Sequence, residues 1–361
     1  MSRWTVEQAR DWYERLPWMV GCNFLPSSAV NQLEMWQADT YDRDTIEKEI
    51  SWAEALGFNT LRVYLHDLLW TSDRAGLISR IGDFLAIAGR HRMKVILVLF
   101  DDCHRPDPES GRQPLPVRGI HNSEWKQSPG RKRVLEFSEG TVSETEQQRL
   151  QDYVQGVLTQ FSGDDRILMW DIYNEPGQNG YGDTSFNLLQ QTWKWARDAR
   201  PSQPLTSCQE GALGERNLEL NRQNADILTF HCYDSSKLEP LLKYYTDQHD
   251  HRPAICTEYM ARELGTTFEF SLPLFVQYRV GCLNWGLVAG KSQTHFNWAS
   301  VEQMEALKKN GHFIHPHHPI PEPTLWFHDI FRRDGTAFDP AEIAFIQRMI
   351  NAQGWRHPAA T

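Results

Sequence analysis

The sequence of 361 residues contains no apolar run near the length of about 18 residues that a helix needs to cross a membrane. It has no run of basic residues and a formal net charge of -10, so nucleic acid and anionic membranes are poor partner candidates. Residues 1–16 include acidic side chains and no apolar core of signal-peptide length. We therefore expect a cytoplasmic protein, or a secreted one if a leader has been removed.

Cysteine is scarce, and the six cysteines are widely spaced, with no CxxC pair among them. Each falls in or just after a stretch that is predicted to be a strand, where a free thiol acts as a small buried hydrophobe. This placement favours free, buried thiols over disulfides or a metal cluster. The six are Cys22, Cys103, Cys208, Cys232, Cys256 and Cys282.

Eight short apolar stretches alternate with segments that have a helical pattern. Over a chain of this length, the alternation predicts a single (β/α)8 barrel that occupies residues 1–361, with no repeat or linker to divide it. A doubly wound sheet is the alternative, but no GxGxxG follows any of the strands. The predicted strands are 18–24, 58–65, 94–100, 167–175, 205–208, 226–233, 253–258 and 281–286.

The helical patterns leave two long segments without a predicted element, 25–42 and 101–130. The second contains five prolines, and loops of this length inside compact domains are usually functional or disordered. Both are expected to lie at one end of a cleft and to favour exo action. The predicted helices are 5–16, 44–56, 73–92, 144–161, 188–200, 238–248, 268–279 and 340–350.

Two glutamates end the apolar runs of the fourth and seventh strands. Glu175 ends ILMWDIYNEP, where Pro176 cannot continue the strand, and Glu258 ends PAICTE. The carboxyl ends of barrel strands carry the chemistry, and these two strands face each other across the barrel. Cleavage of a glycosidic bond needs two carboxyl groups that flank one bond, about 5–5.5 Å apart in retaining enzymes.

These motifs make the sequence similar to a known family. WDIYNEP and PAICTEYM resemble the signatures of the retaining glycoside hydrolases of clan A, most closely family 5, the cellulase–mannanase family. The resemblance implies that Glu175 is the acid/base and Glu258 the nucleophile. It also implies that Asn174 contacts the 2-hydroxyl of the sugar.

Four further residues match the same family in order along the chain. Arg62 in NTLRVYL resembles the arginine that supports the nucleophile, and His231 and Tyr233 in TFHCYD resemble a His-x-Tyr pair. The resemblance implies that Tyr233 donates a hydrogen bond to Glu258. Trp285 in LNWGLVAG resembles the tryptophan that forms the floor of the subsite for the cleaved sugar.

The sequence departs from this family at the end of the third strand, where members carry a histidine. Here Phe100 is followed by two aspartates and a cysteine, so His104 is displaced and the matching residue stays open. Loop tryptophans are expected to rim the mouth, where flat aromatic faces stack on sugar rings. These are Trp36, Trp125 and Trp298.

We expect a retaining β-glycoside hydrolase that acts on β-linked oligosaccharides or glycosides without a cofactor or metal. Glu258 must be ionised to attack, so Arg62 and Tyr233 should lower its pKa. The sequence does not indicate the oligomeric state.

Two other functions are compatible with the same fold. A catalytically inactive carbohydrate-binding barrel is disfavoured, because both glutamates are present. A metal-dependent barrel hydrolase is suggested by Asp101, Asp102, His104 and His231. It is disfavoured because no HxH follows the first strand and no HExxH occurs.

Overall fold

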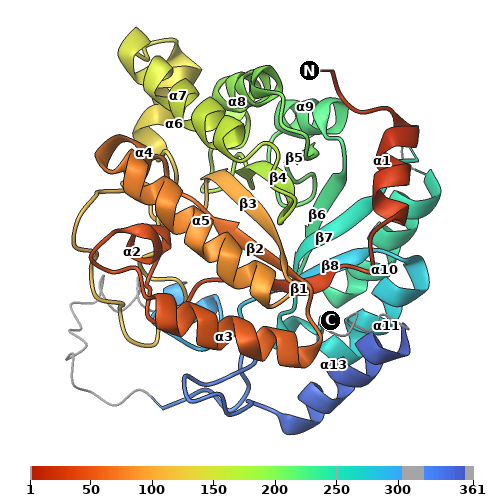
Figure 1. Cartoon of the computed structure of the whole chain (residues 1–361). Coiled ribbons are helices and arrows are strands. Elements are labelled where there is room, and N and C mark those ends of the chain that lie inside the picture. The colour runs from red at the N-terminus through yellow and green to blue at the C-terminus, as the bar shows by residue number, and fades with distance from the viewer. Residues whose placement is uncertain (1, 249–250, 303–320, 354–361) are drawn as a thin grey trace.

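The computed structural model describes residues 2–248, 251–302 and 321–353, and it confirms the predicted (β/α)8 barrel (Figure 1). The strands pair in parallel in the order β5-β4-β3-β2-β1-β8-β7-β6. Each strand lies within one or two residues of its predicted bounds. They are β1 (Val20–Asn23), β2 (Thr60–Tyr64), β3 (Lys94–Asp101), β4 (Ile167–Asn174), β5 (Leu205–Thr206), β6 (Leu228–Cys232), β7 (Ala254–Tyr259) and β8 (Gly281–Trp285).

The barrel closes between β5 and β6, the two ends of the strand order. The hydroxyl of Thr206 donates to the carbonyl of Ile227 at 2.8 Å and lies 2.9 Å from the hydroxyl of Thr229. The backbone N–H of Gln209 donates to the carbonyl of Thr229 at 2.8 Å. A few hydrogen bonds therefore join these strands in place of a continuous ladder.

Helices surround the strands, and each predicted helix is present. The matches are α1 (Val6–Glu14), α3 (Arg43–Leu56), α5 (Arg74–Arg90), α7 (Glu144–Gln160), α8 (Phe186–Ala199), α10 (Ser235–Lys243), α11 (Phe268–Tyr278) and α13 (Pro340–Ala352). Helices that were not predicted include α2 (Gln32–Trp36), α4 (Asp67–Ser72), α6 (Arg131–Glu139) and α9 (Glu215–Asn224).

The helix α2 corrects the prediction for 25–42, which is not a plain loop. The side chain of Asn31 caps it by accepting a hydrogen bond from the N–H of Glu34 at 2.9 Å. This five-residue helix is too short for a periodic pattern to reveal.

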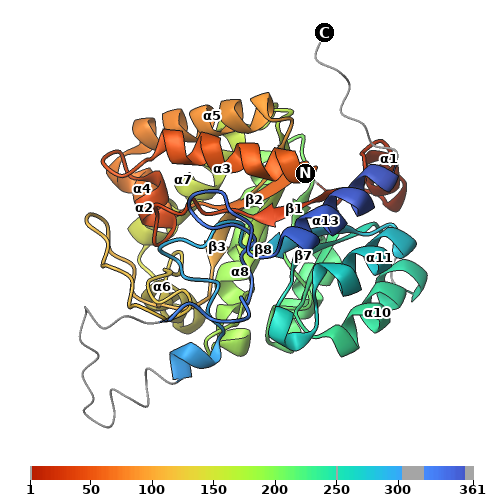
Figure 2. The same cartoon turned by 90° about the horizontal axis from the view of Figure 1, so that it is seen from below.

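The segment after residue 321 is tied to the barrel by a buried arginine. Arg262 donates to both carboxylate oxygens of Glu342 in α13, at 3.0 and 2.6 Å. It also donates to the carbonyls of Trp326 and Asp329, at 3.0 and 3.1 Å. Because α13 packs against α11 and α3, this arginine fixes residues 326–329 beside the barrel (Figure 2).

All six cysteines are free, and all except Cys103 are buried. No helix among the described residues is long and apolar enough to cross a membrane.

Gly21 lies where β1 and β2 approach closely, and its replacement should destabilise the barrel. A Cβ at this position would lie 1.7 Å from the backbone oxygen of Thr60, its register partner. We expect Gly21→Ala to lower the free energy of unfolding by at least about 1–3 kcal/mol, because a strand backbone cannot move aside.

Gly82 in α5 is the matched control, since a Cβ there meets no atom within 4 Å. Gly82→Ala should raise the free energy of unfolding by up to about 1 kcal/mol through helix propensity. Urea unfolding measures both variants. Equal midpoints for the two would contradict the close approach at Gly21.

Candidate active site

The two glutamates lie at the carboxyl ends of their strands, as predicted. Glu175 directly follows β4 and has a φ of +43°. This is a left-handed backbone conformation that residues other than glycine rarely adopt. Glu258 is the penultimate residue of β7, where the register shifts against both neighbouring strands. Such bulges occur next to active sites because they re-aim side chains.

Glu175 and Glu258 approach each other closely across the mouth. One carboxylate oxygen of each and one ring nitrogen of His231 all lie within 4.8 Å of one another. Two carboxyl groups whose nearest oxygens are this close match the retaining arrangement, with groups about 5–5.5 Å apart, better than the inverting one, with groups about 6.5–9.5 Å apart.

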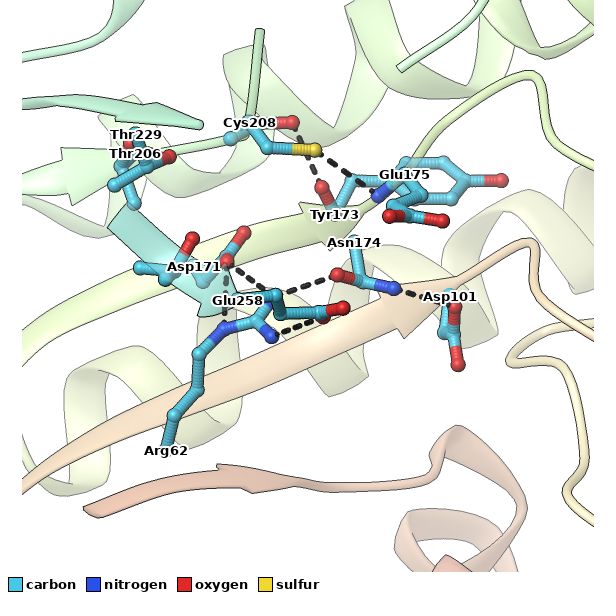
Figure 3. A network of polar contacts seen from close by, with 12 residues as sticks. Arg62, Asp101, Asp171, Tyr173, Asn174, Glu175, Thr206, Cys208, Thr229 and Glu258 are labelled. Atoms are coloured by element: carbon cyan, nitrogen blue, oxygen red, sulfur yellow. Dashed lines mark hydrogen bonds and ion pairs between the residues drawn. The ribbon is translucent and has the colours of Figure 1, made fainter. Parts of the chain in front are cut away.

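Arg62 is the centre of the polar network beneath these glutamates (Figure 3). Its side chain is fully buried and donates to Asp171 Oδ2 from Nε and Nη2, at 3.1 and 2.8 Å. Nη1 donates to Glu258 Oε1 at 2.7 Å, and Nη2 to Asn174 Oδ1 at 2.6 Å. Two buried carboxylates therefore compensate the charge of one buried guanidinium.

Glu258 is surrounded by hydrogen-bond donors on both oxygens. Besides Arg62, the hydroxyl of Tyr64 donates to Oε1, and that of Tyr233 donates to Oε2, each at 2.8 Å. Burial raises the pKa of Glu258, but the charges of His231 and Arg62 and the two tyrosine hydrogen bonds outweigh burial and lower it. The predicted contacts of Arg62 and Tyr233 are confirmed, whereas Tyr64 was missed.

His231 lies between the two carboxylates. Its Nδ1 is 2.6 Å from Glu175 Oε1 and 3.5 Å from Glu258 Oε2, and its Nε2 is 3.1 Å from Thr257 Oγ1. Burial lowers the pKa of His231, but the negative charges of Glu258 and Glu175 outweigh it, so the net shift is upward. The two glutamates therefore favour the protonated form of the imidazole.

Asn174 is held at both ends of its amide. Its Oδ1 accepts from Arg62, and its Nδ2 donates to Asp101 Oδ1 at 2.9 Å. Asp101 also accepts from the indole of Trp125 at 2.6 Å, and burial raises its pKa to about 7. The same nitrogen also donates to Cys103 Sγ at 3.6 Å, so both of its N–H groups have a partner within the protein.

A cysteine, not a histidine, contacts Glu175 from the end of β3. The thiol of Cys103 donates to Glu175 Oε2 at 3.0 Å, and burial raises its pKa well above the usual value, which keeps it a donor. Cys103 is thus more than a small buried hydrophobe. The cysteine beside two aspartates after strand three was its only signal in the sequence.

The ring of His104 contacts His121 and Asn122 and is hydrogen-bonded to neither glutamate in the described part of the chain. Its ring is 6.1 Å from that of His121, and its Nε2 is 3.5 Å from Asn122 Nδ2. Burial lowers the pKa of His104 to about 4, so the ring is neutral. The displaced histidine therefore lines the neighbouring wall and does not replace Cys103.

Gly211 lets the loop after β5 pass directly over the glutamate–histidine pair. It has a φ of +110°, and a Cβ there would lie 2.8 Å from His231 Nδ1 and 3.0 Å from Glu175 Oε1. Sequence reasoning missed this residue, because a glycine in a loop gives no signal of what lies beside it.

The tryptophans differ in their positions. Trp285 at the end of β8 packs edge-on against Tyr64 and Trp125, with ring centroids 5.8 and 5.5 Å apart. Trp298 is 39% exposed and lies 5.1 Å from the ring of Tyr233. Trp125 is buried, so its ring faces other aromatic side chains more than solvent.

The prediction that Trp36 binds sugar is wrong. Its side chain is fully buried in α2, where the indole donates to the carbonyl of Tyr64 at 2.7 Å and packs against Phe84. The ring belongs to the core between the helices and the barrel. It supports the strand that carries Arg62 without reaching the mouth.

Among the described residues, only Glu175, His231 and Glu258 form a group of three metal-ligating side chains. Asp101, Asp102 and His104 do not join them. The fit to a cation is poor, because Glu258 already accepts hydrogen bonds from a guanidinium and two tyrosines. A divalent ion would also add charge beside Arg62.

A barrel with two facing carboxylates at its carboxyl end is the architecture of a glycoside hydrolase. Residues 21–285 match the family Cellulase (glycosyl hydrolase family 5). The chain belongs to this family. No curated protein matches the sequence significantly.

Solved structures of this family share the barrel. A GH5_18 point variant from Streptomyces cattleya in complex with Manb1-4GlcNAc has a TM-score of 0.59 and 12% identity, covering 95% of this chain and 82% of that one. Exo-beta-1,4-mannosidase Op5Man5 from Opitutaceae bacterium strain TAV5 has a TM-score of 0.60 and 16% sequence identity. The match covers 93% of this chain and 59% of that one.

The endo-1,4-beta-D-mannanase from Thermotoga petrophila RKU-1 has a TM-score of 0.56 and 12% identity, covering 93% of this chain and 100% of that one. Similarity at these identities shows the fold.

Removing the buried guanidinium should destabilise the protein strongly. Arg62→Met leaves Asp171 and Glu258 buried without their cation, so we expect a loss of about 3–5 kcal/mol in the free energy of unfolding. Arg90→Met is the control, since Arg90 is 47% exposed in its ion pair with Glu47 and should cost less than about 1 kcal/mol.

The difference between wild type and Arg62→Met should also depend on pH. The folded-state pKa of Glu258 lies below its usual 4.5, so its stabilisation is complete above that pH and is lost as pH falls through the folded-state pKa. Urea unfolding across this range should show the difference shrinking in acid. A constant difference would contradict the role of the ion pair.

Proposed function

We propose that this glycoside hydrolase is a retaining β-glycosidase, with Glu258 as the nucleophile and Glu175 as the acid/base. The observation that carries the proposal is the approach of the two carboxylates to within 4.8 Å, with Arg62 bonded to only one of them. The ionised group and the proton donor are thereby distinguished.

In the first step, the carboxylate of Glu258 attacks the anomeric carbon, and Glu175 gives its proton to the leaving oxygen. The bond to the aglycone breaks as the glycosyl ester forms. The donors from Arg62, Tyr64 and Tyr233 keep Glu258 ionised and oriented before the attack. The N–H of Asn174 that donates to Cys103 Sγ can turn to the 2-hydroxyl of the sugar, because sulfur is a weak acceptor.

In the second step, Glu175 takes a proton from water, and the resulting hydroxide displaces Glu258 from the sugar with net retention. Formation of the ester removes the negative charge that contributes most to the raised pKa of His231. His231 should therefore hold its proton less firmly in the intermediate. Cys103 and His231 keep Glu175 in place through both steps.

The substrate class is a β-linked oligosaccharide or glycoside, and the mechanism needs no cofactor. The structures with the same barrel include a complex with Manb1-4GlcNAc, an exo-beta-1,4-mannosidase and an endo-1,4-beta-D-mannanase. This supports β-1,4-mannosides as the first substrates to assay.

The nucleophile is tested by covalent trapping. A 2-fluoro glycoside should inactivate the wild type and leave one glycosyl group on Glu258, which peptide mass spectrometry locates. Glu258→Gln should abolish turnover and labelling, because an amide cannot attack the anomeric carbon. The matched control is Glu263→Gln in η3 (Arg262–Leu264), an exposed glutamate nearby.

A label on another residue would overturn the assignment. Wild-type protein that binds β-glycosides without hydrolysing any would favour the inactive binding barrel. Loss of activity in EDTA, restored by a divalent cation, would favour the metal-dependent alternative.

The acid/base is tested by chemical rescue. Glu175→Ala should lose about 10²–10⁴-fold in kcat on substrates with poor leaving groups and much less on nitrophenyl glycosides, which need no proton. Azide should restore the rate of the second step and yield a β-glycosyl azide. Absence of rescue in a variant with native thermal unfolding would contradict this role.

A further inference from the structure

The loop 101–130 crosses from the end of β3 to the loop after β8. The N–H of Asn122 donates to the carbonyl of Ser292 at 2.8 Å, and the N–H of His121 donates to Ser300 Oγ at 3.1 Å. The amide of Gln293 accepts from the N–H of Gly119 and donates to the carbonyl of Val117, at 2.8 and 2.7 Å. Two loops from separate strands are thus joined over the barrel.

The same loop is fastened to the segment around α2. Asn31 Nδ2 donates to the carbonyl of Glu124 at 2.9 Å, and Gln32 Nε2 donates to that of Lys126 at 2.8 Å. Both side chains are fully buried. The segment around α2, the loop 101–130 and residues 292–300, which follow β1, β3 and β8, are therefore hydrogen-bonded into one continuous structure. We call these three segments the bridge. It lies over the strands that carry Arg62 and Trp285.

A small cavity lies beneath the bridge. Its lining includes Tyr64, Trp125 and Trp285 together with Asn122 and Asp329. Its volume is about 20 Å³, which is room for one group of the size of a water molecule and not for a sugar ring. The cavity therefore has space for a hydroxyl but not for a further sugar subsite.

Two buried acceptors in this cavity lack partners. Asp329 and Asn122 are 1% and 2% exposed, and the Oδ1 atom of each has no hydrogen bond in the described part of the chain. Asp329 Oδ2 accepts from Thr294 at 2.8 Å. Each buried acceptor left unpaired costs about 1–3 kcal/mol, so a donor is expected there when the site is filled.

The backbone beside Asp329 is built around this carboxylate. Gly286 has a φ of +78°, and a Cβ there would lie 2.5 Å from Asp329 Oδ1. Arg262 holds the carbonyl of Asp329 from the other side. The unpaired oxygen is thus fixed in position at the end of β8.

The cavity lies on the side of the sugar that is transferred to the enzyme. Tyr64 lines it and also donates to Glu258, the proposed nucleophile, whereas Glu175 belongs to β4 on the opposite side of the strand order. The sugar bound to Glu258 is the glycone, so the bridge closes the glycone end. The structures with the same barrel include an exo- and an endo-acting enzyme, so the fold alone does not decide between them.

We propose that the bridge makes the enzyme exo-acting, removing one sugar at a time from the non-reducing end, and that Asp329 and Asn122 accept hydrogen bonds from hydroxyls of this terminal sugar. This rests on the proposed glycosidase function. A hydroxyl group is small enough to enter the cavity and can donate a hydrogen bond. An apolar or anionic group has no hydrogen to donate and would leave the Oδ1 atoms of Asp329 and Asn122 unpaired.

The mode of action is tested on β-1,4-linked manno- and gluco-oligosaccharides of four to six units that carry a fluorophore at the reducing end. We expect labelled products that shorten by one sugar at a time, with free monosaccharide, and no cleavage when the non-reducing end is blocked. Early release of shorter internal fragments, or cleavage of the blocked chain, would overturn the exo inference alone. No hydrolysis of any chain or nitrophenyl glycoside would overturn the proposed function as well.

The role of Asp329 is tested with monodeoxy nitrophenyl glycosides. Burial raises the pKa of Asp329 to about 7, so the assay is run above that pH, where the carboxylate is ionised. There Asp329→Ala should lower kcat/KM on the parent glycoside by about 10- to 100-fold, as expected for a hydrogen bond to a charged group. On the one deoxy glycoside that lacks the contacted hydroxyl, wild type and Asp329→Ala should react at similar rates.

Asp334→Ala is the control, since Asp334 is an exposed aspartate of the same segment and should change neither series. Thermal unfolding checks that each variant is folded. An equal loss for Asp329→Ala on every deoxy glycoside would show a merely structural role and overturn the assignment.

Discussion

The buried guanidinium of Arg62 is the interaction on which the rest of the site depends. It stands at the centre of the barrel mouth and bonds side chains from three other strands, β1, β4 and β7, through Asn23, Asp171, Asn174 and Glu258. A buried cation is tolerated only when negative charges and hydrogen-bond acceptors surround it. Moving any of these side chains away from Arg62 would therefore destabilise the fold. The position of Glu258 follows from this one requirement, whereas Glu175 is held by Cys103 and His231.

The surroundings of the two glutamates differ in kind. Glu258 receives donors from Arg62 and two tyrosines, whereas Glu175 receives a thiol and an imidazole. Strong, fixed donors suit a group that must stay ionised until it attacks. A weak thiol donor and a titratable ring suit a group that must give and take a proton. His231 connects the two, because the charge of each glutamate contributes to its raised pKa.

The sequence was sufficient for the strands, since each is a short apolar run that ends in a polar residue or a turn. It also predicted that Arg62, His231, Tyr233 and both glutamates share one site, because they follow a family pattern, and the structure brings these side chains into contact. The sequence did not predict residues whose positions depend on contacts between distant parts of the chain. Trp36 was placed at the rim because a loop sequence does not show which way a ring faces. Cys103, Tyr64 and Gly211 act through neighbours far away in the sequence, so no local pattern marks them.

The joint between β5 and β6 has a consequence for how the molecule responds to heat. There the wall is closed by the Thr206 hydroxyl and a few backbone bonds, so separating these two strands breaks fewer interactions than separating any pair joined by a full ladder. The joint lies between Gly211, which covers the catalytic pair, and β6, which carries His231. Local fraying would therefore separate the imidazole of His231 from the carboxylate of Glu175 while the rest of the barrel stays intact. Opening of this joint should therefore cost less free energy than unfolding of the whole barrel.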